Sequence, residues 1–185
     1  MDKRSLDSKL ARVLISFSMP LILSGLLQQL YNWADAFIVG NVEGEFALAA
    51  IGATSVITSL FIMAITGFTS GISILSARYI RNEDRYIQNK ILSSFTLVLG
   101  IIMTIISLIT IYYTDTILLA LQTPEEIFPI AKIYVQIILG GIPFMTVYNV
   151  YAAVLRGIGD SKMSFYAVLV SAITNVILDI VLVVG

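Results

Sequence analysis

The sequence predicts an all-α, polytopic membrane helix bundle, and three observations support that fold class. Hydrophobic residues make up 58% of the 185 residues and charged residues only 12%, whereas a soluble domain has about 25% charged residues. The mean hydropathy is +0.93. The apolar residues also fall into five stretches, each long enough for the roughly 20 helical residues that cross a bilayer core.

The five stretches are separated by short polar segments, at 40–47, 78–90, 114–126 and 156–164. We therefore expect an N-terminal cytoplasmic segment at 1–12 and a membrane domain at 13–185, with spanning helices at 13–39, 48–77, 91–113, 127–155 and 165–184. The first stretch has a basic start like a secretory signal peptide. Its apolar run exceeds the 7–15 residues of such a peptide, which favours a membrane helix.

The basic residues predict the orientation, because cytoplasmic loops collect Lys and Arg. Ten of the 11 Lys and Arg residues lie before the first span, between the second and third, or between the fourth and fifth. The remaining one, Lys132, lies near the start of the fourth span, from which a long side chain reaches the interface. The N-terminus is therefore predicted to be cytoplasmic.

Two stripes of polar residues run along predicted spans. In the first span the stripe consists of Ser24, Gln28, Asn32 and Asp35, and in the fifth of Ser171, Asn175 and Asp179. Both carboxylates fall in the outer half of the membrane, where such a group must pair, take up a proton or bind a cation. The alternative is that Asp35 is wetted at the surface and Asp179 hydrogen-bonds to neighbouring helices.

Other residues of the spans predict packing and shape. Gly67 and Gly71 form a small-xxx-small pair suited to close helix contact, with the lining of a cavity as the alternative. Pro20 and Pro143 interrupt the backbone hydrogen bonds of their helices and should bend them. Polar and aromatic residues in the first and fourth spans are candidates to line a substrate cavity, with packing and interfacial anchoring as the alternative. These candidates are Gln28, Asn32, Tyr148, Asn149 and Tyr151.

Composition excludes several kinds of chemistry. The chain has no Cys and no His, so it has no thiolate nucleophile, no imidazole base and no Cys/His metal site. It has no phosphate-binding loop either, and its net charge of −1 argues against a nucleic-acid partner. Residues 157–160 resemble the GxGD signature of intramembrane aspartyl proteases. They lie in a predicted cytoplasmic turn far from Asp35, so we expect no enzyme activity and no cofactor.

Four segments together resemble the multidrug and toxic compound extrusion (MATE) transporters. QQLYNWADAFIVG at 28–40 and ALAAIG at 47–52 resemble the region of the family's first helix. LRGIGDSKMSFY at 155–166 is similar to its loop between helices four and five, and NVILD at 175–179 is similar to its fifth-helix motif. The resemblance covers essentially the whole chain.

The resemblance implies a fold, a function and a location. MATE transporters have twelve membrane helices in two six-helix lobes, and they export organic cations and other amphipathic compounds in exchange for Na⁺ or H⁺. This chain matches helices one to five, which is most of one lobe, so it is expected to be a fragment. Its implied partners are the lipid bilayer, small amphipathic or cationic substrates, and the sixth helix and second lobe of the same protein. The implied location is the cell membrane, a bacterial inner membrane, in multi-pass form.

The resemblance also implies roles for individual residues. Asp35 is similar to the first-helix acidic residue of the family's coupling site, and Asn175 and Asp179 are similar to its fifth-helix partners. Pro20 corresponds to the first-helix proline proposed as a hinge. Na⁺, if it is the coupling ion, would bind at these three polar residues. Two alternatives remain: a lipid-linked saccharide flippase of the same superfamily, and a membrane subunit that does not transport.

Overall fold

A computed structural model describes the backbone of residues 3–80 and 85–181. Its helices are α1 (Lys3–Val42), α2 (Glu45–Ile80), α3 (Arg85–Tyr112), α4 (Thr114–Ala120), α5 (Phe128–Gly157) and α6 (Ser161–Asp179). Five of them, all except α4, are long and apolar enough to cross a membrane. The described residues contain no strand. The prediction of an all-α bundle with five long apolar helices is therefore confirmed.

The long helices continue into the polar segments that flank the apolar stretches. The helix of the first stretch, for example, ends at Val42 rather than at residue 39. Two turns that follow contain a glycine with positive φ, Gly44 at 87° and Gly159 at 83°. Glycine has no Cβ and adopts this conformation without strain, so it suits the reversal of the chain there. The predicted end of the last span, at residue 184, lies outside the described residues.

The segment at 114–126, which the sequence predicts as a connecting loop, contains the short helix α4. Thr114 and Leu118 of this helix are buried, Leu118 completely. Its Asp115 also forms an ion pair of 2.7 Å with Lys132 of α5. Lys132 therefore extends to a carboxylate on α4. The seven residues of α4 are too few to cross a bilayer.

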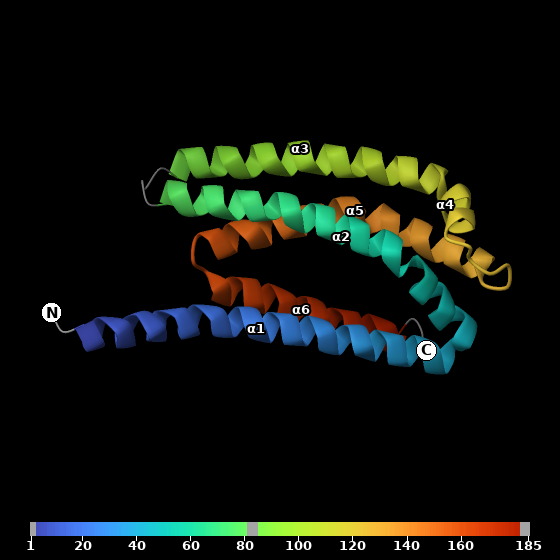
Figure 1. The fold of residues 1–185 in the computed structure, drawn as a ribbon, viewed down its shortest axis with the longest axis horizontal. Coiled ribbons are helices and arrows are strands. Elements are labelled where there is room, and N and C mark those ends of the chain that lie inside the picture. The colour runs from blue at the N-terminus through green and yellow to red at the C-terminus, as the bar shows by residue number, and fades with distance from the viewer. Residues whose placement is uncertain (1–2, 81–84, 182–185) are drawn as a thin grey trace.

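The five long helices form two groups (Figure 1). One is the α1–α6 pair, in which the two helices lie side by side and run in the same direction. The other is the α2–α3–α5 group, in which α5 packs against both α2 and α3. The turn between α1 and α2 joins the groups at one end of the molecule, and the turn between α5 and α6 joins them at the opposite end.

The hydrophobic core lies in the α2–α3–α5 group. Its largest fully buried side chains are Ile65 and Ile72 of α2, Met103 of α3, Leu118 of α4, and Leu139 and Ile142 of α5. No member of this core cluster comes from α1 or α6. The apolar side chains of α1 are instead largely exposed, as expected for a helix that faces lipid or another part of the protein.

Among the described glycines, the one packed most closely against another helix is one that the sequence analysis did not select for packing. A Cβ added to Gly157 of α5 would collide with the backbone oxygen of Ser73 and lie 3.0 Å from Cβ of Ser76, both in α2. The predicted close contact at Gly67 and Gly71 is wrong for the described part of the chain, because a Cβ added to either would meet no atom within 4 Å. Gly67 lines an open groove on the surface of α2 instead.

One hydrogen bond between helices compensates for a proline. In an α-helix the carbonyl of Leu139 would accept the N–H of residue 143, but Pro143 has none. The hydroxyl of Ser107 in α3 donates to that carbonyl instead. Ser107 is itself buried. The interruption at Pro143 is therefore satisfied by the neighbouring helix, which fixes α5 against α3 at this level.

Candidate functional site

The α1–α6 pair positions the polar residues that the sequence selected. An apolar groove of about 390 Å³ lies between the two helices, and it is lined by Leu27, Leu30, Tyr31 and Ala34 of α1 and by Leu169, Ala172, Ile173, Val176 and Ile177 of α6. Because Ala34 and Val176 line the same groove, their sequence neighbours Asp35 and Asn175 lie at about the same level of the two helices.

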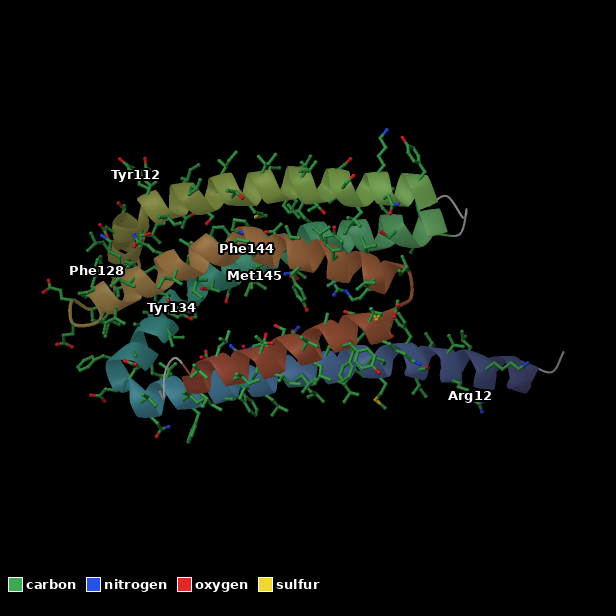
Figure 2. The ribbon with its side chains drawn as sticks, turned by 180° about the vertical axis from the view of Figure 1, so that it is seen from behind. Arg12, Tyr112, Phe128, Tyr134, Phe144 and Met145 are labelled. Atoms are coloured by element: carbon green, nitrogen blue, oxygen red, sulfur yellow. The ribbon has the colours of Figure 1, made fainter. Side chains whose placement is uncertain are left out.

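Asp35 lies between the two groups of helices. Its side chain is partly buried and interacts electrostatically with the Tyr134 phenol of α5. Figure 2 shows Tyr134 in the part of α5 that passes above the end of α1 containing Asp35. A second interaction of this kind joins Tyr31 of α1 to Tyr148 of α5, which also interacts with Arg156. Both electrostatic interactions act between a residue of α1 and a residue of α5, which belong to different groups of helices.

Asn175 has a buried side-chain oxygen. Its Oδ1 atom is inaccessible to solvent and has no hydrogen-bond partner among the described residues. Buried polar atoms are nearly always hydrogen-bonded, and an exception calls for a specific explanation. An amide oxygen in this condition is suited to accept a proton donor or to ligate a cation such as Na⁺.

Asp179 is the last residue of α6, one helical turn beyond Asn175. The spacing of four residues puts both on the same face of the helix. The side chain of Asp179 lies outside the described part of the structure. The predicted position of this carboxylate opposite Asp35 therefore also lies outside the described residues.

The remaining candidate residues have different surroundings. In α1, the hydroxyl of Ser24 donates a hydrogen bond of 2.8 Å to the carbonyl of Pro20. The helix is continuous through Pro20. Gln28 is partly buried and Asn32 is exposed. In α5, the amide of Asn149 donates to the carbonyl of Met145 at 2.9 Å, whereas Tyr148 and Tyr151 are exposed.

Sequence reasoning missed Tyr31 and Tyr134. Tyr31 lies beside Asn32 in the polar stripe of the first span, but a tyrosine there fits membrane packing equally well. Tyr134 lies near the end of its span, where tyrosines commonly anchor a helix at the interface. Only the position of α5 over α1 distinguishes these two from the other tyrosines of the chain, and no local sequence signal carries that information.

The described side chains contain no group of three or more His, Cys, Asp or Glu residues that could hold a metal ion. Any ion that binds between α1 and α6 would therefore use carboxylate, amide and phenol oxygens from separate helices. Such oxygen ligands suit H⁺ or a hard monovalent cation rather than a transition metal.

Comparison with known proteins identifies the family. The MatE family model matches residues 20–181. This chain belongs to the MATE family of transporters. The "Probable multidrug resistance protein YoeA" of Bacillus subtilis is 35% identical to it over 173 residues, which cover 91% of the chain and 36% of YoeA. The "Multidrug export protein MepA" of Staphylococcus aureus is 25% identical over 179 residues, which cover 96% of the chain and 40% of MepA.

Solved structures agree with this assignment. The outward-facing conformation of a multidrug resistance MATE transporter of the MOP superfamily superposes with a TM-score of 0.81 at 26% identity, covering 91% of the chain and 37% of that structure. The chain thus spans little more than a third of the length of the relatives it matches, consistent with an N-terminal portion. It belongs to a multi-pass membrane protein of a family of transporters rather than enzymes.

Proposed function

We propose that the complete MATE protein containing this chain is a secondary active antiporter, which exports organic, often cationic, compounds in exchange for Na⁺ or H⁺. The observation that carries the proposal is the pairing of α1 with α6. This pairing supports a shared ion site because Asp35 of α1 and the buried, unpartnered Oδ1 of Asn175 of α6 lie at about the same level. Asp179 lies one turn further along α6.

The proposed mechanism uses the chemistry of a poorly hydrated carboxylate. Such a group alternates between a protonated, neutral form and an ionised form held by a cation. A proton or Na⁺ that enters from outside would neutralise the Asp35 and Asp179 site, while Asn175 orients Asp179 or supplies a neutral oxygen ligand. Loss of the negative charge would weaken the hold on a bound organic cation. Because binding of the two ligands is coupled, each would expel the other.

Pro20 is the proposed hinge of this cycle. It leaves a gap in the backbone hydrogen bonds of α1, on the helix that bears Asp35. No described residue of α1 belongs to the hydrophobic core cluster, so repacking of this helix disturbs little of that core. Neutralisation of Asp35 would shift α1 about Pro20 and open the site outward.

We further propose that the protein lies in a bacterial cell membrane with a cytoplasmic N-terminus. The basic residues support this orientation, since all except Lys132 lie on the side of the N-terminus. Gln28, Asn32, Tyr148, Asn149 and Tyr151 are the proposed lining of the substrate cavity. The electrostatic interaction between Tyr148 and Tyr31 supports an aromatic surface for organic cations at this level.

Two observations favour the export of organic compounds over the flippase alternative. The relatives are named as multidrug proteins, and the predicted spans contain few basic side chains. Lys132, the basic residue within the predicted spans, is occupied by its ion pair with Asp115. A saccharide flippase has to hold a pyrophosphate and would need more basic groups in its cavity. A purely structural subunit would pair a buried oxygen such as Asn175 Oδ1, which has no hydrogen-bond partner among the described residues.

The test is accumulation of a cationic dye by cells that produce the complete protein. We expect Asp179→Asn and Asp35→Asn each to abolish ion-driven efflux, because an amide cannot alternate between charged and neutral forms. Collapsing the Na⁺ gradient and the pH gradient separately identifies the coupling ion.

Asp115→Asn is the matched control, since it removes one carboxylate from an exposed ion pair on α4. It should leave efflux unchanged. Efflux at the wild-type rate by Asp179→Asn, with equal amounts of protein in the membrane, would overturn the assignment of the coupling site.

A further inference from the structure

A second groove lies at the opposite end of the α1–α6 pair from Asp35. It has a volume of about 930 Å³ and is formed where the beginning of α1 meets the turn between α5 and α6. Its lining includes two basic residues from different elements, Arg12 of α1 and Lys162 of α6, together with Ser16 and Ser161. Figure 2 shows Arg12 on the part of α1 that extends past the first turn of α6.

The groove continues along the helix pair as an apolar channel. An adjoining groove of about 460 Å³ shares Ser16 and Lys162 with it. Its remaining lining is almost entirely apolar and runs towards the middle of the helices: Ile15, Met19, Pro20, Leu23, Phe165 and Tyr166. The two grooves together have a charged end and a long apolar end, which match the headgroup and the acyl chains of a phospholipid.

The charged end has an excess of positive charge. Asp160 is the acidic residue in its lining, and the Oδ1 atom of its carboxylate accepts the backbone N–H of Met163 at 3.0 Å. Among the described side chains, neither Arg12 nor Lys162 forms an ion pair. Both basic side chains are exposed, so an anion that enters the groove meets two cations without first breaking a salt bridge.

The depth of the two cations also fits a membrane headgroup. Arg12 directly precedes the apolar stretch that starts at residue 13, and Lys162 precedes the stretch that starts at residue 165. Both lie where a helix leaves the hydrocarbon core, which is the level of lipid phosphates. The apolar channel starts at the same level and runs into the core, where acyl chains lie.

We propose that this groove binds one anionic phospholipid, with its phosphate between Arg12 and Lys162 and an acyl chain along Met19 and Leu23. The leaflet is the cytoplasmic one, and this detail alone rests on the orientation proposed above. A soluble anion would use the charged end but leave the apolar channel unfilled. The site is separate from the coupling residues, so lipid binding and transport can fail independently.

The test is native mass spectrometry of the complete protein titrated with phosphatidylglycerol or phosphatidylethanolamine of identical acyl chains. We expect tighter binding of phosphatidylglycerol. A basic residue near an anionic lipid surface has an interaction that corresponds to about fivefold in affinity. Arg12→Gln and Lys162→Gln should therefore each weaken phosphatidylglycerol binding by about fivefold, and the double variant by the product of the two.

Two basic residues at the same end of the bundle provide matched controls. Arg78 of α2 and Lys90 of α3 are exposed and lie outside both grooves, so Arg78→Gln and Lys90→Gln should leave the affinity unchanged. An equal loss in these controls would show a general charge effect and overturn the site.

Two further outcomes would also contradict the proposal. If the wild-type protein binds both lipids equally, either another part of the protein fills the groove or the site does not distinguish the anionic headgroup from the zwitterionic one. If inorganic phosphate displaces phosphatidylglycerol completely, the site recognises a free anion and not a lipid. Retention of the lipid in excess phosphate, together with its loss from the Arg12 and Lys162 variants, is the expected result.

Discussion

The α2–α3–α5 group and the α1–α6 pair use the same kinds of apolar residue for different purposes. In the α2–α3–α5 group these residues interlock in a continuous core, supported by a helix crossing at Gly157 and by the Ser107 hydrogen bond. The α1–α6 pair contributes nothing to that core cluster, yet it carries Asp35, Asn175 and Asp179.

This difference suggests a division between a scaffold and a moving part. A packed core resists displacement because any shift opens cavities or forces clashes. The α1 and α6 helices pack against each other and lie outside the core cluster, so a shift of this pair leaves that core intact. A coupling site on the α1–α6 pair can therefore change shape while the α2–α3–α5 group stays fixed.

The largest expected effect comes from deleting core volume. Ile65→Ala removes a side chain that is 0% exposed and should lower the free energy of unfolding by about 2–5 kcal/mol, because the cavity cannot close fully. Ile173→Ala, at a position of α6 that is 53% exposed, should cost much less. Unfolding of the complete protein in mixed detergent micelles measures both. Equal losses would show that the α1–α6 pair is as tightly packed as the α2–α3–α5 group.

A smaller effect is expected where α5 crosses α2. Gly157→Ala places a Cβ against the Ser73 backbone oxygen, which cannot rotate away, so the helices must separate at a cost of about 1–3 kcal/mol. Gly140→Ala makes the same change in the same helix, where a Cβ meets no atom within 4 Å. It should be neutral or stabilise by up to about 1 kcal/mol through helix propensity. A loss of stability at Gly140 similar to that at Gly157 would contradict the close crossing.

The sequence predicts the helices well because their signal is local. A run of about twenty or more mostly apolar residues predicts a membrane-spanning helix, whichever helices pack against it. The short helix α4 was missed because Leu118 is buried by contacts with other helices, and its own segment is too short to show a period. Gly67 and Gly71 were expected to make a close contact that the described residues do not show, and Gly157 was not expected to make one. Only the crossing of two helices decides which glycine is needed.

The same distinction between features of one helix and features of helix packing applies to the candidate site. The spacing in the fifth span correctly indicates a helix that extends through Asn175 and Asp179, because that is a property of one helix. The electrostatic interaction between Asp35 and Tyr134 joins residues from the first and fourth spans, and nothing in either segment indicates the other. The buried state of the Asn175 oxygen likewise depends on the neighbouring helices.

The smallest of these effects concerns the hydrogen bond that replaces the amide of Pro143. Ser107→Ala leaves the Leu139 carbonyl buried without its donor, at a cost of about 1–2 kcal/mol in the free energy of unfolding. Ser93→Ala is the matched control in α3. The Ser93 hydroxyl is exposed and bonds only locally, to the carbonyl of Lys90 at 3.2 Å, so its loss should have little effect.

A double-mutant cycle separates this hydrogen bond from simple loss of packing. Pro143→Ala restores a backbone N–H that can donate to the Leu139 carbonyl, so the carbonyl no longer depends on Ser107. In the Pro143→Ala background we therefore expect Ser107→Ala to cost about 1 kcal/mol less than in the wild type. If the cost is the same in both backgrounds, the serine stabilises α3 against α5 by contact alone. The scaffold would then tolerate the interruption at Pro143 without a donor from its neighbour.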